Sequence, residues 1–216
     1  MKTVAVILSG AGYLDGSEIY ETTLTLLALD RHHVRYQCLA PDIPQHHVID
    51  HRSGEATGET RRVLTEAARL ARGDIRPLAG AHAGDYDALI IPGGYGVAKN
   101  LCDFAVKGHD MQVNEDVLVF ARALHRAGKP VGLICIAPVL APAIGGPGTR
   151  CTIGDDPATA NAIRHMGGVH VDCAVDDCVV DAERRIVSTP AYMLAGRISE
   201  ADAGIRKLVD AVLAMT

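Results

Sequence analysis

The chain has 216 residues, a formal net charge of -5 at pH 7 and a hydrophobic fraction of 48%. That length and composition suffice for a globular fold with a full core, so we expect residues 1–216 to form one domain. The acidic balance and the lack of a clustered basic run exclude a nucleic-acid-binding footprint. No apolar stretch is long enough to span a bilayer, so we expect no membrane partner either.

The N-terminal residues and the cysteines predict the compartment. The first apolar run, residues 3–9, is too short for a secretory signal, and the glycine-containing segment after it has no cleavage-like sequence. The six cysteines are scattered and form no C-x-x-C pair. We interpret them as reduced thiols, which predicts a cytoplasmic protein.

The first part of the chain begins with a strand, a helix and a second strand. Residues 3–9 are apolar and rich in β-branched residues, and a glycine turn follows them. Asp15 or Ser17 can cap the next helix, whose apolar face has the i, i+4, i+7 spacing that starts at Tyr20. Residues 34–40 alternate enough to predict the second strand.

The same alternation continues through the middle of the chain. A helix is expected over residues 59–72, and a buried strand over 87–91 ends in the turn Pro92-Gly-Gly-Tyr-Gly96. A helix over 114–126 then precedes an apolar strand over 131–134. Beyond it we expect a helix up to about Met166, two short strands over 178–181 and 186–189, and a last helix from about Ser199.

Strands that alternate with helices predict parallel βαβ units. We therefore expect an α/β fold with a mostly parallel, doubly wound sheet between two helical layers. Ligands of such sheets bind outside the carboxyl ends of the strands. Residues 10–16, residues 92–96 and Cys135 all fall at such ends, so one site can use all three.

Cys135 is the candidate nucleophile. It ends the strand over 131–134, and the apolar segment Ile136-Ala137-Pro138 after it opens like a helix. This is the outline of a nucleophile elbow, in which free amides at the helix start favour thiolate over thiol. The alternative is a buried structural cysteine, because free cysteines are among the most buried residues.

A thiolate nucleophile needs a proton carrier and donors for the oxyanion that it creates. Glu18 is the candidate proton carrier, since it follows the turn after the first strand, although it could simply cap the helix. The flexible backbone of Gly93 and Gly94 suits an amide that points into a cleft. The Gly94 and Ile136 amides would be the two donors.

The sequence gives little support to a catalytic histidine beside Cys135 or to a metal site. Residue 136 is isoleucine, so no histidine directly follows Cys135, and His109, His125 and His170 receive no assigned role. No H-E-x-x-H motif occurs among the ten histidines, and the one pair with H-x-x-x-H spacing, His47 and His51, falls in a polar, loop-like segment. We therefore expect neither a metal nor another cofactor.

These features together resemble the class I glutamine-amidotransferase-like superfamily, which includes the PfpI peptidases and the DJ-type deglycases, and more closely its ElbB (ES1-like) branch. The matching segments run from end to end of the chain. They are Val6–Gly10, Asp15–Ile19, Ala40–Asp42, Gly54–Ala56, Pro92–Leu101, Cys135–Pro138, Thr152–Gly154 and Thr189–Leu194.

The resemblance implies a flavodoxin-like three-layer α/β sandwich and a glutathione-independent glyoxalase that turns glyoxal into glycolate, with a less defined association with isoprenoid biosynthesis. It also implies a homodimer. The nucleophile of the family falls on Cys135 and its acidic partner on Glu18. The histidine and glutamate of the amidotransferase triad find no match, and neither does the PfpI-type histidine after the cysteine.

The sequence and the resemblance leave three functions open. In the first, Cys135 and Glu18 convert a small dicarbonyl to a 2-hydroxy acid through a hemithioacetal. In the second, Cys135 is a reactive thiol of a redox-sensing or isoprenoid-biosynthesis accessory protein. In the third, the chain is an amidotransferase subunit that needs a partner.

Overall fold

The structure, a computed structural model, describes residues 2–216. Its main sheet has the order β3-β2-β1-β4-β5-β9-β8, in which all neighbours pair in parallel except β8 and β9. The strands are β1 (Thr3–Ile7), β2 (Arg35–Ala40), β3 (Ile75–Pro77), β4 (Ala88–Ile91), β5 (Val131–Ile134), β8 (Val179–Asp181) and β9 (Ile186–Thr189). Two further strands, β6 (Arg150–Cys151) and β7 (Val169–His170), form a small parallel sheet.

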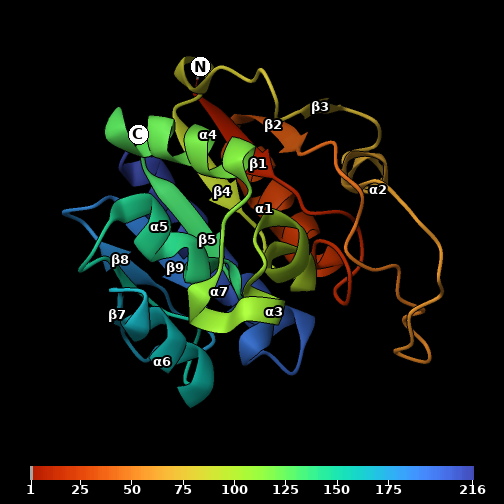
Figure 1. Cartoon of the computed structure of the whole chain (residues 1–216). Coiled ribbons are helices and arrows are strands. Elements are labelled where there is room, and N and C mark those ends of the chain that lie inside the picture. The colour runs from red at the N-terminus through yellow and green to blue at the C-terminus, as the bar shows by residue number, and fades with distance from the viewer. Residues whose placement is uncertain (1) are drawn as a thin grey trace.

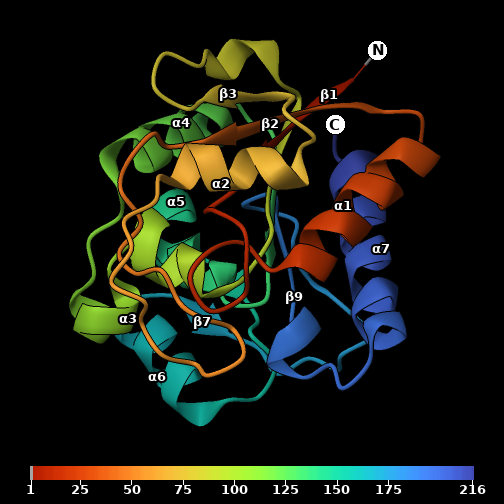
Figure 2. The ribbon, with the colours of Figure 1, turned by 90° about the vertical axis from the view of Figure 1, so that its right-hand side faces the viewer.

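Helices cover both faces of the main sheet, as Figures 1 and 2 show. One face packs against α1 (Ile19–Arg31), α2 (Val63–Leu70) and α7 (Ile198–Ala214), and the other against α4 (Glu115–Arg126) and α5 (Ala141–Gly145). Two shorter helices, α3 (Phe104–Lys107) and α6 (Pro157–His165), lie toward the end of the sheet where β5 stops (Figure 1). The expected three-layer α/β fold is confirmed.

Burial on both faces explains why the central strands are continuous apolar runs. Every residue of β4 and β5 is buried, and so is β1 from Val4 onward. Gly132 in β5 lets α7 approach closely, because a Cβ there would lie 2.9 Å from the Leu208 side chain and 3.1 Å from that of Val212. The fully buried core is aliphatic, as expected from two Phe and no Trp.

The strand order places the switch point between β1 and β4. From β1 the chain moves outward through β2 to β3, then returns to the other side of β1 with β4 and continues to β5. The carboxyl ends of β1, β4 and β5 therefore lie side by side. The turns expected to form the site follow these three strands.

Helix α1 differs from its prediction in cap and in buried face. Glu18 is the N-cap, and its carboxylate accepts a hydrogen bond from the Glu21 amide at 2.7 Å. Asp15 instead accepts a hydrogen bond from the Ile49 amide. The buried face consists of Glu21, Thr22, Thr25, Ala28 and Leu29, whereas Tyr20 and Leu27 are exposed. The prediction was wrong here because it followed apolar spacing, while polar residues make up much of the buried face.

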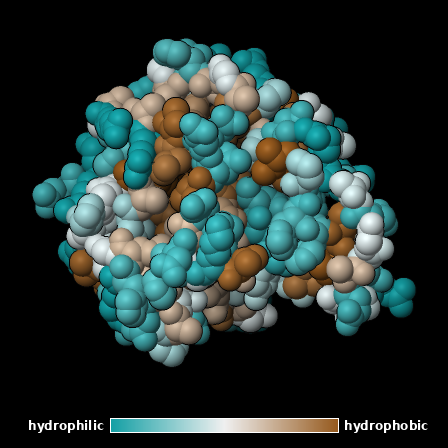
Figure 3. Space-filling view, in the orientation of Figure 1, coloured by the Kyte–Doolittle hydropathy of each residue, from teal (hydrophilic) through white to brown (hydrophobic). Residues whose placement is uncertain are grey.

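The helix expected over 59–72 is shorter, because residues 59–62 belong to the loop before it. The long loop over residues 42–62 extends away from the body at the lower right of Figure 1, where Figure 3 shows it as a separate lobe. Two isolated bridges, Pro44 with Arg62 and Ile49 with Ala56, hold it together. Its inner part docks on the turn after β1, where the Leu14 amide donates to His51 Nε2 at 3.3 Å.

Candidate active site

Cys135 stands directly after β5, on a strained turn. Its φ of 63° lies in the left-handed region, which costs a residue with a side chain on the order of 1–3 kcal/mol. Its amide donates to the Thr189 carbonyl at 2.9 Å, so β9 holds the turn in place. A 3₁₀ turn over Ala137–Leu140 follows, and α5 begins only at Ala141. This geometry is that of a nucleophile elbow.

The glycine turn after β4 wraps around the cysteine. A Cβ on Gly93 would lie 2.3 Å from the Cys135 Cβ, so only glycine fits there. Gly94 has a φ of +97°, and a Cβ would lie 2.4 Å from the Gly16 carbonyl oxygen. The Gly94 and Ile136 amides both donate hydrogen bonds to the Cys135 sulfur. The Gly93 amide donates to Glu21 Oε2 at 2.8 Å.

The carboxyl that contacts the sulfur belongs to Glu21. This residue is fully buried in the first turn of α1, and its carboxyl lies beside the Cys135 thiol, with both groups against Gly93. The Gly93 amide holds Oε2, and the Tyr192 amide donates to Oε1 at 3.1 Å. Burial, reinforced by the charge of Glu18, raises the pKa of Glu21 to about 7. Such a carboxyl can accept and return a proton near neutral pH.

Glu18 lines the same pocket, but its expected contact with the sulfur is replaced by that of Glu21. The Glu18 carboxylate caps α1, and burial raises its pKa above the usual value. Glu21 could have been found in the sequence from its position, because this residue lies four residues before Thr25 on the buried face of the helix. A buried glutamate beside threonines is visible only once that face has been chosen correctly.

The thiol of Cys135 does not have the lowered pKa that the sequence predicts. Burial, with the nearby Glu21 carboxylate, raises its pKa well above the usual range, and the Gly94 and Ile136 amides only partly oppose this. The helix effect is small because a 3₁₀ turn, not a long α-helix, follows the elbow. At neutral pH the sulfur is therefore a thiol, and its activation requires proton transfer to Glu21.

A pocket of about 520 Å³ opens over the sulfur. It is bounded by Cys135, Ile136, Gly94 and Glu18, and by aromatic side chains that follow β1, β4 and β9 or begin α3. Of the residues described, no histidine lines it. His125 bonds the Arg184 carbonyl, His170 lies buried in β7, and His109 stacks on His165. A Cys-His arrangement is thus absent from the pocket as the described residues form it.

Comparison with known proteins places the chain in a family. No family model matches it. Glutamine amidotransferase-like class 1 domain-containing protein 3, a mitochondrial protein of Homo sapiens, is 44% identical over 223 residues that cover 99% of this chain and 83% of that protein. The mitochondrial ES1 protein homolog of Rattus norvegicus is 42% identical, covering 99% and 84%. The chain belongs to the ES1 family of amidotransferase-like class 1 domain proteins.

Solved structures agree with this ES1-family assignment. An isoprenoid biosynthesis protein with an amidotransferase-like domain from Ehrlichia chaffeensis superposes with a TM-score of 0.92 and 37% identity, over 100% of this chain and 99% of the other. Glyoxalase III from Candida albicans shares the fold, with a TM-score of 0.63 at 12% identity over 99% and 97% of the two chains. The amidotransferase-like, ES1-like part of the resemblance is confirmed.

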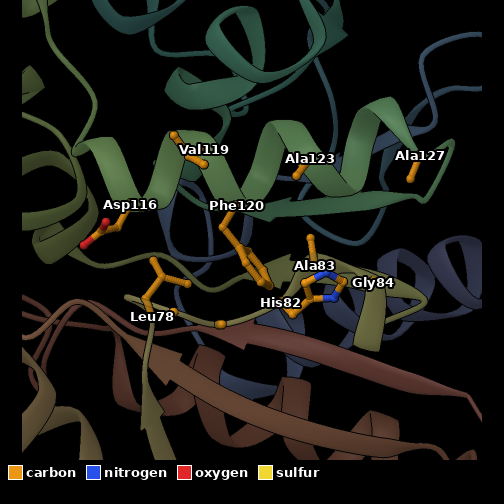
Figure 4. A pocket seen from close by; sticks show the side chains of 11 residues that line it. Leu78, His82, Ala83, Gly84, Asp116, Val119, Phe120, Ala123 and Ala127 are labelled. Atoms are coloured by element: carbon orange, nitrogen blue, oxygen red, sulfur yellow. The ribbon is translucent and has the colours of Figure 1, made fainter.

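A second pocket of this ES1-family chain lies away from the nucleophile elbow at Cys135. It measures about 380 Å³ and separates α4 from the segment over residues 78–84. Figure 4 shows Phe120 and His82 facing each other across it, with Asp116 at one end. None of the predicted site residues lines it, so the pocket over Cys135 is the candidate active site.

Two further observations bear on metals and membranes. Within residues 2–216, no three His, Cys, Asp or Glu side chains are grouped so that they could hold a metal ion. None of the helices in that range combines the length and the apolar composition that crossing a bilayer requires.

The raised pKa of Glu21 predicts how stability of this ES1-family chain changes with pH. A carboxyl whose folded pKa of about 7 exceeds its ordinary value of 4.5 stabilises the fold fully below pH 4.5, and loses that contribution as pH rises through 7. The shift corresponds to on the order of 3 kcal/mol. Urea unfolding between pH 5 and 8 should show the wild type losing stability relative to Glu21→Gln, which stays neutral. Parallel profiles would contradict a raised pKa.

Proposed function

We propose that this ES1-family chain is a cofactor-independent glyoxalase that converts small dicarbonyls to 2-hydroxy acids. The observation that carries the proposal is the placement of the Glu21 carboxyl beside the Cys135 thiol, beneath a pocket and next to the Gly94 and Ile136 amides. A nucleophile, a proton carrier with a pKa of about 7 and two oxyanion donors are the groups that this chemistry needs. Glu21 takes the role that the sequence assigns to Glu18.

The first step joins the dicarbonyl to the enzyme. The Cys135 thiol passes its proton to the Glu21 carboxylate as the sulfur bonds one aldehyde carbon of glyoxal. The carbonyl oxygen becomes an oxyanion next to the Gly94 and Ile136 amides, and it then takes the proton to give a hemithioacetal. Because proton transfer accompanies addition, the high pKa of the thiol does not prevent the step.

The second step is an internal oxidation and reduction. Glu21 removes the proton from the sulfur-bearing carbon, and an enediolate forms. Return of that proton to the neighbouring carbon gives a thioester of glycolate. Water then cleaves the C–S bond, which releases glycolate and restores the thiol. One carbon is oxidised and the other reduced, so glyoxal and water balance glycolic acid without an external redox partner.

The other candidate functions have less support. Oxidation sensing requires an accessible thiolate, whereas Cys135 is buried and its thiol pKa is raised. Glutamine hydrolysis by the usual triad needs a histidine, and none of the described residues supplies one to the pocket. An accessory role in isoprenoid biosynthesis is favoured only by the description of the Ehrlichia chaffeensis relative.

We also propose a compartment and an oligomeric state for this chain. The sequence predicts the cytoplasm, whereas the human and rat relatives are named as mitochondrial. The proposed chemistry requires only that Cys135 remain reduced, and the cytoplasm keeps cysteine thiols reduced. Homodimerisation is proposed from the family resemblance and the frequency of twofold dimers, and light scattering on the purified chain tests it.

A direct assay tests the proposed function. Purified protein, treated with a metal chelator and free of glutathione, is incubated with glyoxal, and glycolate is followed by proton NMR. We expect enzyme-dependent glycolate that increases linearly with protein concentration. Glyoxal consumption without glycolate, through adducts on lysine and arginine side chains, would contradict the proposal.

A further inference from the structure

The pocket over Cys135 is far larger than glyoxal requires. Glyoxal has four non-hydrogen atoms, whereas pockets of about 300–1,000 Å³ hold drug-sized ligands, and this one measures about 520 Å³. With glyoxal at the sulfur, most of that volume would contain only water. The residues that line the pocket therefore indicate what larger substituent the substrate carries.

Aromatic side chains are concentrated at this pocket. The chain contains six Tyr, two Phe and no Trp, and four of these eight residues line it. They are Tyr13, Tyr95, Phe104 and Tyr192, and Tyr20 lies against Tyr192 with ring centroids 6.1 Å apart. Tyr13 and Tyr95 remain 49% and 52% exposed, although the Tyr13 ring contacts the His51 ring and Lys99 lies over the Tyr95 ring. Flat apolar groups pack well on such rings.

The charges at the pocket are all negative. Glu18 and Asp156 line it, and no lysine, arginine or histidine does so among the described residues. Asp156 caps α6 by accepting a hydrogen bond from the Thr159 amide at 2.7 Å, and this bond lowers the pKa of its carboxyl. The cation of Lys99 does not line the pocket, although it contacts the ring of Tyr95, which does. It donates to the Leu14 carbonyl at 2.8 Å and lies 5.4 Å from the centre of the Tyr95 ring.

We propose that this pocket selects uncharged dicarbonyls that carry a flat apolar substituent, and that Asp156 excludes substrates that carry a carboxylate. The proposal rests on the proposed function, because it names the substrate class of the same site. The rings bind the substituent, and the Glu18 and Asp156 carboxylates repel an anion, since no cationic side chain is among the described residues that line the pocket. An aryl glyoxal fits this description, and glyoxylate does not.

Charge selection can be tested without turnover. Cys135 is labelled with two methanethiosulfonates of equal length, one ending in trimethylammonium and one in sulfonate. The sulfur displaces methanesulfinate and forms a mixed disulfide, whose rate is read by peptide mass spectrometry. Relative to the same ratio for mercaptoethanol, we expect the cationic reagent to be favoured roughly tenfold at low salt, and less as salt is added.

Two variants locate the charge effect. Asp156→Asn keeps a good N-cap residue and removes the charge, so the anionic rate should rise roughly threefold or more relative to the cationic rate. Asp155→Asn makes the same change at an exposed neighbour that does not line the pocket, and its ratio should stay that of the wild type. Equal labelling rates for the two reagents, relative to mercaptoethanol, would overturn the role of Asp156. An equal change of the rate ratio in both variants would overturn it as well.

Turnover measurements test the preference for substrates with a flat apolar substituent. Initial rates are compared for glyoxal, for phenylglyoxal, which would give mandelate, and for 4-carboxyphenylglyoxal. We expect kcat/KM for phenylglyoxal to exceed that for glyoxal by roughly tenfold, and the carboxylate to cancel the gain. Tyr95→Ala should lower the phenylglyoxal preference, whereas Tyr36→Ala, on β2 outside the pocket, should not.

The two sets of measurements separate the inference from the proposed function. Charge-selective labelling with no turnover of any dicarbonyl would support the charge preference and reject the glyoxalase proposal. Turnover of glyoxal without a preference for phenylglyoxal would keep the glyoxalase and overturn the apolar selectivity.

Discussion

Replacement of Cys135 by serine is expected to abolish conversion of glyoxal to glycolate, with kcat/KM falling by ~10³-fold or more. A serine oxygen is far less nucleophilic than sulfur and has no strong base beside it, since Glu21 has a pKa of only about 7. Serine has almost the same shape as cysteine, so the turn with φ of 63° and its hydrogen bond to Thr189 should persist. The readout is glycolate formation beside an unchanged urea unfolding midpoint.

The matched control is Cys173→Ser. Cys173 is partly exposed and does not line the pocket, so its replacement should leave glycolate formation as in the wild type. Wild-type activity in Cys135→Ser would disprove the covalent mechanism. Loss of activity in both variants would indicate a general requirement for thiols instead of a nucleophile at position 135.

Glu21→Gln is expected to lower kcat/KM by ~10²–10⁴-fold, the usual contribution of general acid–base catalysis. The glutamine amide cannot take the thiol proton or carry one between the two substrate carbons. The wild-type rate should fall as pH drops below about 7, because the proton acceptor is then already protonated. That pH dependence should disappear in Glu21→Gln. The measurement is the pH profile of kcat/KM between pH 5.5 and 8.5.

Glu18→Gln is the control that distinguishes the two carboxyls. Both residues belong to the start of α1 and both changes remove one carboxyl, but only Glu21 lies beside the Cys135 thiol. We expect Glu18→Gln to keep the pH dependence, with its midpoint moved to lower pH because the Glu18 charge no longer raises the pKa of Glu21, and to lose less than tenfold in rate. If instead Glu18→Gln removed the pH dependence and Glu21→Gln kept it, Glu18 would be the proton carrier.

The sequence predicted the fold and the position of Cys135 at the elbow because both depend on short-range patterns. Strands β4 and β5 are buried on both faces, so their residues form continuous apolar runs that stand out from the helices around them. The glycine turn after β4 and the cysteine after β5 follow directly from the ends of those runs. Parallel connections then bring these ends to one edge of the sheet. The Gly94 and Ile136 amides were predicted on this basis, and both contact the sulfur.

The rotation of α1 about its axis decides which carboxyl lies beside Cys135. Glu18 and Glu21 are three residues apart, or about 300° of helical turn. The buried face of α1 carries Thr22 and Thr25, so apolar spacing indicated the wrong side. The Glu21 carboxyl is held by the Gly93 and Tyr192 amides, 72 and 171 residues away in the chain. No local pattern could reveal contacts at those separations.

What the sequence by itself determined was the alternating α/β order, the position of Cys135 and the glycine turn beside it, since each is written in neighbouring residues. Only the tertiary structure decided the ionisation of the site. Segments from β1, β4, β5 and β9 enclose Cys135 and Glu21 together, and the loss of water raises the pKa of both groups. Desolvation depends on everything that surrounds a group, so it exists only once the chain has folded.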